Sequence, residues 1–238
     1  IPYMQSRKSN IIEFESAQVE STDLTEIIEE DKRYGTFQPF NGEYYIYRVL
    51  NEDKEITNKQ VLKSIEYSYR RISLRTNLKF RRARDGEYAD FRIEFRTVAT
   101  DPEKELKAST LMYHYYPISN SSNRLRGLCV INKDFFWTTS GKTLDMHYID
   151  PEHYPEPNSG YGGKTYDLDQ VYTHEVLHGL GLPHSKTSGN VMSPNYGIMA
   201  EWLSDEDIAR IQAKYGSRNI SESRIKRWLK WLKIASNR

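Results

Sequence analysis

The chain has 238 residues, of which 37% are hydrophobic, and its 34 Lys and Arg nearly balance its 33 Asp and Glu. This composition is typical of a globular protein and excludes a disordered or fibrous chain. Because the formal net charge is only +1, no overall field favours nucleic acid as a partner. We therefore expect one principal folded core.

The two ends of the chain carry opposite charges. Residues 11–31 hold eight acidic residues and no Lys or Arg, whereas residues 217–238 hold seven basic residues and one acidic residue. We interpret residues 1–35 as an acidic N-terminal extension or propeptide remnant with room for one short helix. The initial Ile suggests a processed or excised chain. Residues 36–216 would then form the folded domain, followed by a basic amphipathic tail at 217–238.

The first half of the domain predicts strands around one long helix. Residues 43–50, "EYYIYRVL", are rich in aromatic and β-branched residues, which favour a strand. Thr57 begins a capping box, and apolar residues at helical spacing predict a helix that runs to Ser73. Residues 89–96, "ADFRIEFR", alternate with a period of two, as a half-buried strand does.

The second half predicts one further strand and then helices. Residues 127–132, "GLCVIN", read as a strand in which Cys129 is a small core residue; as the only cysteine, it can form no intramolecular disulfide. Residues 150–165 read as a loop, residues 166–179 as a helix, and residues 203–215 as a helix that begins at Ser204. The sequence contains no run of about 18 apolar residues, the length that a membrane-spanning helix needs. Strands first and helices later indicate an α+β domain.

The stretch "HEVLHGLGLPH", residues 174–184, has the spacing of a metal site. On a helix, His174 and His178 lie one turn apart on one face and can share a zinc ion. Glu175 can reach a water on that metal as a general base. Gly181 lets the chain leave the helix, so that His184 supplies a third nitrogen. Three ligands and one open position are typical of a catalytic zinc site.

This stretch, followed by Met192, resembles the extended H-E-x-x-H-x-x-G-x-x-H motif and Met-turn of the metzincin metallopeptidases. Ser185 after the third histidine, and the segment "NVMSPNY" at residues 190–196, resemble the matrixins within that clan. The likeness extends over about residues 39–216 and includes "TNLKF", "ADFRIEF" and "LSDEDIARIQAKYG". It implies that Met192 lies beneath the metal and that Pro194 and Tyr196 line a substrate pocket.

The resemblance implies a metzincin-type zinc protease domain, with a twisted mixed β-sheet, an active-site helix, a Met-turn and a C-terminal helix. Residues 36–216 would be the matrixin-like catalytic domain of a secreted or extracellular endopeptidase, in which Glu175 activates a zinc-bound water. Its protein or peptide substrate would pair with an edge strand that we place at residues 127–132. No nucleic acid partner is expected.

Some matrixin features are missing from the sequence. Residues 96–110, "RTVATDPEKELKAST", lack the H-x-D pair that helps to bind a structural zinc, Tyr113 or His114 stands near one expected histidine, and Val130 stands where another would be. We therefore expect one catalytic zinc and no structural second zinc, and calcium binding stays open. The propeptide cysteine that silences the zinc of matrixins is also missing.

Two other functions of the protein and two roles of its tail stay open. The protein could be a zinc-binding, non-catalytic interaction protein on a metzincin scaffold, or a member of another metzincin family that acts on bacterial or cell-surface protein. In the tail, apolar residues line one helical face and basic residues crowd the rest, which is typical of binding to an anionic membrane or an acidic partner. The same face could instead pack against its own domain. The apolar residues are Ile225, Trp228, Leu229 and Leu232.

Overall fold

The computed structural model describes residues 23–50, 59–117, 124–139, 142–143, 165–196 and 202–218. The capping box predicted at Thr57, residues 150–164 of the predicted loop, and the tail beyond residue 218 lie outside these ranges. Within them, every helix is too short or too polar to cross a membrane.

The main sheet has five strands in the order β2-β1-β3-β5-β4, and it is mixed. Strands β1, β2, β3 and β5 run parallel, whereas β4 pairs antiparallel with β5. The alternation predicted at residues 89–96 is confirmed, because Phe91, Ile93 and Phe95 are buried and the residues between them are partly exposed. The strands are β1 (Tyr45–Val49), β2 (Phe80–Arg82), β3 (Phe91–Arg96), β4 (Met112–His114) and β5 (Leu128–Asn132).

The edges of the main sheet are β2 and β4, so the prediction of an edge strand at residues 127–132 was wrong. Strand β5 lies between β3 and β4, and all five of its residues are buried. A continuous apolar run fits such an interior strand, which is covered on both faces and paired on both sides. Strand β4 has only three residues, too few for a period-two pattern to be recognised.

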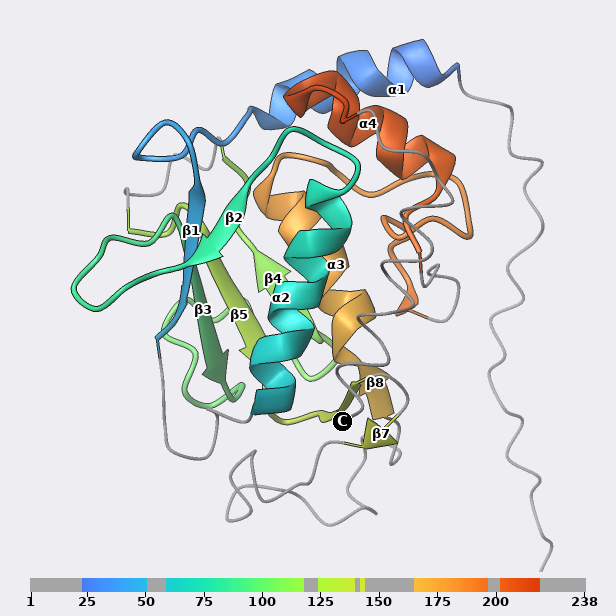
Figure 1. The fold of residues 1–238 in the computed structure, drawn as a ribbon. Coiled ribbons are helices and arrows are strands. Elements are labelled where there is room, and N and C mark those ends of the chain that lie inside the picture. Colours follow the sequence, from blue (N-terminus) through green and yellow to red (C-terminus); the bar gives the residue numbers. More distant parts are fainter. Residues whose placement is uncertain are drawn as a thin grey trace, which may run out of the picture.

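Two helices, α2 (Lys59–Ser73) and α3 (Leu168–Gly179), lie side by side in front of the main sheet (Figure 1). The two helices pack against each other in the hydrophobic core, where the hydroxyls of Tyr69 and Tyr172 are 2.8 Å apart. Helix α3 begins two residues later than predicted, because Tyr166 and Asp167 belong to strand β8. The Asp167 carboxylate accepts a hydrogen bond from the Gln170 amide and caps the helix.

A second, smaller sheet leads into α3. It has the order β7-β6-β8, with β6 (Phe136–Thr139) antiparallel to β7 (Lys142–Thr143) and parallel to β8 (Thr165–Asp167). Because β8 runs directly into α3, this sheet fixes where the helix starts.

The N-terminal helix α1 (Leu24–Asp31), followed by the 3₁₀ helix η1 (Lys32–Tyr34), lies beside the C-terminal helix α4 (Asp205–Tyr215) (Figure 1). Helix α4 begins one residue after the predicted start at Ser204, and Ser204 itself caps the helix within a capping box. Two nitrogens of Arg210 donate to the Asp31 carboxylate at 2.8 and 2.9 Å, and both side chains are almost fully buried. The boundary at residue 35 between the N-terminal extension and the folded domain stays a prediction. Asp31, which precedes it, contacts the domain through Arg210.

Replacing Asp31 with Asn should lower the free energy of unfolding by about 3 kcal/mol, because it removes the carboxylate that accepts two hydrogen bonds from the buried Arg210 cation. Urea unfolding of both proteins measures this difference. The matched control is Glu29→Gln, also on α1, which breaks the exposed pair with Lys32 and should cost less than about 1 kcal/mol. Equal effects of the two substitutions would contradict a structural role for the buried pair.

Candidate metal centre

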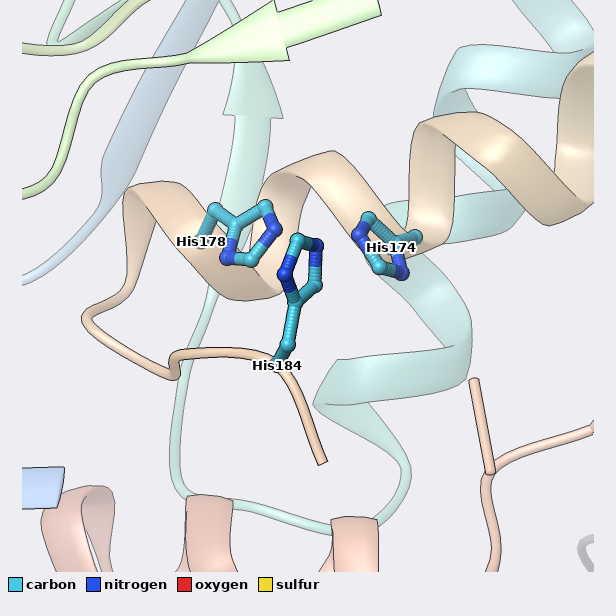
Figure 2. A group of neighbouring side chains, drawn as sticks. All are labelled: His174, His178 and His184. Atoms are coloured by element: carbon cyan, nitrogen blue, oxygen red, sulfur yellow. The ribbon is translucent and has the colours of Figure 1, made fainter. Parts of the chain in front are cut away.

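Three histidines converge as the sequence predicted. His174 and His178 lie on α3, and His184 points toward them from the loop that follows the helix (Figure 2). One nitrogen from each ring lies within 4.8 Å of the other two. The ring centroids are 4.6 Å apart for His174 and His178, and 4.7 Å apart for His178 and His184. These residues could hold one metal ion.

The rings on α3 are oriented by backbone carbonyls. The Nδ1 of His174 donates to the Val191 oxygen at 2.6 Å, and the Nδ1 of His178 donates to the Leu182 oxygen at 2.7 Å. Because Nδ1 carries the proton in each ring, Nε2 keeps its lone pair for a metal. Burial lowers the pKa of His174 to about 4 and lowers the pKa of His178 and His184 as well. Neutral imidazoles are the form that binds zinc.

Gly181 allows the chain to turn from the helix to His184. Its φ is +91°, in the left-handed region that favours glycine. A Cβ there would lie 2.2 Å from the backbone oxygen of Gly35. The turn is closed by the Leu182 amide, which donates to the Leu177 oxygen at 2.9 Å. Both the conformation and the close contact therefore require glycine.

Replacing Gly181 with Ala should destabilise the protein by about 1–3 kcal/mol, because the methyl group must displace the backbone near Gly35. The same displacement should weaken metal binding, since Gly181 lies three residues before His184. Thermal unfolding and a zinc titration measure the two effects. The control is Gly189→Ala, because Gly189 has a similar φ of +83° but open space around its Cα. A loss of stability in Gly181→Ala no larger than that in Gly189→Ala would contradict the role of the close contact with Gly35.

Glu175 is buried beside the histidines. Its side chain and the three histidines line one cleft. The Oε2 atom of Glu175 has no hydrogen-bond partner within the described part of the chain. Burial raises the pKa of this carboxyl well above its ordinary value. An unpaired buried carboxylate is costly to folding, so its place beside a metal-binding group points to function.

The turn after His184 is tied to α4. The Ser185 amide donates to the Met192 oxygen at 2.8 Å, and the amide of Val191 donates to the buried Asp207 carboxylate at 2.8 Å. Met192 itself is fully buried in the main core. The Val191 carbonyl orients His174, and the Val191 amide is bonded to Asp207. Asp207 of α4 therefore fixes the residue that orients His174.

The histidines open onto a cleft of about 490 Å³. Pro194 and Tyr196, which the sequence placed at a pocket, both line it. Tyr196 is fixed by the Asp167 amide, which donates to its hydroxyl at 2.9 Å. The other lining residues are Ser109, Thr110, Leu111, Met112, Tyr113, His114, Tyr116, Tyr166, Val171, His174, Glu175, His178, His184 and Asn195.

Two residues near the metal centre were not recognised from the sequence as part of it. The Nδ1 of the buried His114 donates to the backbone oxygen of Glu175 at 2.8 Å, and its ring fills the space beside Gly179, where a Cβ would lie 2.2 Å away. The hydroxyl of Tyr116 lies 3.1 Å from the Nδ1 of His178. Both residues come from β4 or the segment just after it, which no local pattern identified.

Stability should fall below pH 6.5 partly because of His114. Burial lowers the pKa of His114 to about 4, so between pH 4 and 6.5 the unfolded chain binds a proton that the folded protein does not. The contribution of neutral His114 to the free energy of unfolding is fully present above pH 6.5, and it decreases by roughly 3 kcal/mol as the pH falls to 4. Unfolding of metal-free wild type and His114→Asn, compared across this range, isolates it. A stability difference that does not change with pH would contradict the assignment.

The mixed sheet, the helix with two histidines, the turn with the buried Met192 and the C-terminal helix define a metzincin-type zinc protease domain. The family model for the matrixins, Peptidase M10, matches residues 39–216, and the chain therefore belongs to the matrixin family. Membership in this family indicates a zinc-dependent metalloprotease.

Similar proteins are matrix metalloproteinases. The chain is 36% identical to Homo sapiens matrix metalloproteinase-26 over 90 residues, which cover 37% of this chain and 33% of that protein. It is 38% identical to Danio rerio matrix metallopeptidase-21 over 72 residues, or 28% of this chain and 12% of that protein. With Mus musculus interstitial collagenase A the identity is 39% over 80 residues, or 27% and 17%. The chain thus spans one third or less of these relatives.

Proposed function

We propose that the protein is an endopeptidase that hydrolyses protein or peptide substrates with one zinc ion held by His174, His178 and His184. The observation that carries this proposal is the convergence of three neutral imidazoles beside the buried, unpartnered carboxylate of Glu175 in one cleft. The donor set fits zinc, since three nitrogens and an open position are typical of catalytic zinc sites. A bound zinc ion would activate water near neutral pH and polarise the scissile carbonyl.

Glu175 would act as the general base and then as the acid. It accepts the proton of the attacking water and passes it to the amine that leaves when the peptide bond breaks. The raised pKa of its carboxyl suits this role, because a carboxylate with a higher pKa is a stronger base and takes the proton of water more readily. The protonated carboxyl can then donate that proton to the leaving amine.

The substrate would lie extended along β4. This strand forms one edge of the main sheet, and Ser109 to His114 line the cleft. An extended peptide can add to such an edge by backbone hydrogen bonds. One side chain would enter the space lined by Pro194 and Tyr196. The similarity to matrix metalloproteinases also supports a secreted or extracellular protein.

A mixed peptide library, incubated with the protein in the presence and absence of a zinc chelator, tests this proposal. We expect internal peptide bonds to be cleaved, cleavage to stop with chelator, and added zinc to restore it. Zinc bound at one equivalent without any cleavage would instead support a non-catalytic interaction protein. The cleaved sequences would also show which residues the pocket accepts.

A further inference from the structure

The segment that joins β3 to β4, residues 97–111, is arranged around Arg96, the last residue of β3. Its guanidinium contacts three carboxylates. The Nε of Arg96 donates to Glu94 at 2.7 Å, and its Nη1 donates to Asp101 at 2.9 Å. The same Nη1 also donates to Glu103. Only 12% of the Arg96 side chain is exposed, and the Asp101 side chain is fully buried.

Asp101 extends these contacts to the backbone and to the edge strand. One of its oxygens accepts from the Leu106 amide at 2.9 Å, which closes the segment on itself. The other accepts from the hydroxyl of Tyr113, also at 2.9 Å, in addition to Arg96. Because Tyr113 lies on β4, the Asp101 carboxylate ties the segment to the strand that borders the cleft.

The far end of the segment forms part of the cleft wall. Ser109, Thr110 and Leu111 line the cleft, and the backbone oxygens of Thr110 and Leu111 accept hydrogen bonds from Asn132. The segment is therefore fixed at one end by Asn132 and at the other by the Arg96 cluster, which we define as Arg96, Glu94, Asp101 and Glu103.

Three carboxylates that face one another repel unless a cation lies between them. A guanidinium suits this position, because it stays charged and offers five donors in a planar fork. A zinc or calcium ion fits the position between these carboxylates less well than a guanidinium does. The Asp101 oxygens are already taken by Arg96, Leu106 and Tyr113, and Tyr113 offers a hydroxyl that is engaged with Asp101.

We propose that Arg96 is the internal cation that orders residues 97–111, so that this wall of the cleft needs neither calcium nor a second zinc ion. The proposal does not depend on catalysis, because it concerns the order of a segment rather than the reaction. Only the role of this wall in holding a peptide rests on the proposed endopeptidase function.

Hydrogen exchange at the Leu106 amide, followed in the zinc-loaded protein with and without added calcium ions, tests the proposal. We expect calcium to leave the exchange rate of the wild type unchanged. Arg96→Met should speed exchange at Leu106 about 10-fold or more, since it removes charge-assisted hydrogen bonds that hold Asp101 in place. The matched control is Arg81→Met, which removes the bidentate pair between Arg81 on β2 and Glu87 and should leave exchange at Leu106 unaffected.

Two results would overturn the proposal. One is slower exchange at Leu106 in the wild type when calcium is added, which would show that the segment binds that ion. The other is an exchange rate in Arg96→Met no different from that in Arg81→Met. Should Arg96→Met fail to fold, Arg96→Lys keeps a positive charge with fewer donors and is expected to show intermediate exchange, and the calcium comparison on the wild type still decides.

Discussion

Replacing Glu175 with Gln is expected to lower the rate of peptide cleavage by roughly 10²- to 10⁴-fold, the usual share of a general acid–base group. The amide has nearly the same shape but cannot accept a proton from water. Because Glu175 is buried with an unpartnered oxygen, its loss should leave the stability equal to that of the wild type or higher. Steady-state cleavage and zinc content, measured on the same preparation, check both expectations.

The control for this substitution is Asp169→Asn on the same helix. Asp169 is also buried, but it is bonded to Ser64 of α2 and does not line the cleft. Its replacement should lower stability while turnover of the folded fraction is retained. Peptidase activity that persists in Glu175→Gln at the wild-type rate would overturn the assigned role.

Replacing His184 with Ala is expected to weaken zinc binding by more than 100-fold. Even residues that only orient a metal ligand change affinity by about 10- to 100-fold, and a direct ligand contributes more. His184 lies on an exposed part of its loop, so the variant should fold. Competition with a chromogenic chelator measures the affinity, and cleavage should be lost together with the metal.

A histidine outside the metal-binding group provides the control. His114→Asn keeps a donor near the Glu175 carbonyl and removes no proposed ligand, so its zinc affinity should stay within about 10-fold of the wild type. Wild-type zinc affinity in His184→Ala would show that the third ligand comes from elsewhere in the chain.

Local sequence patterns predicted the parts of the fold that repeat with a clear period. The alternation of residues 91–96 is present in the structure, and the C-terminal helix begins at Asp205, one residue after the predicted start at Ser204. The edge strand was misplaced because β4 is only three residues long, whereas the five-residue β5, which is apolar except for Asn132, has a recognisable strand pattern. The Asp31–Arg210 pair joins residues 179 positions apart, and no local pattern records such a contact.

The convergence of the three histidines was predictable because two of them follow helical geometry. The spacing of His174 and His178 and the glycine before His184 place three rings together without knowledge of the rest of the fold. The groups that orient the rings could not be predicted, since the carbonyl of Val191 reaches His174 only through the turn that Asp207 holds. Arg96 was missed for a similar reason, because its three carboxylates converge only once the segment has folded back.

The central claim is that one zinc ion at the three histidines makes this domain a peptidase. Its most direct test is the initial rate of peptide cleavage as metal-free protein is titrated with zinc. The rate should start at zero, rise in proportion to added zinc and level off at one equivalent. Cleavage by the metal-free protein, or full binding of one equivalent without any cleavage, would contradict the claim.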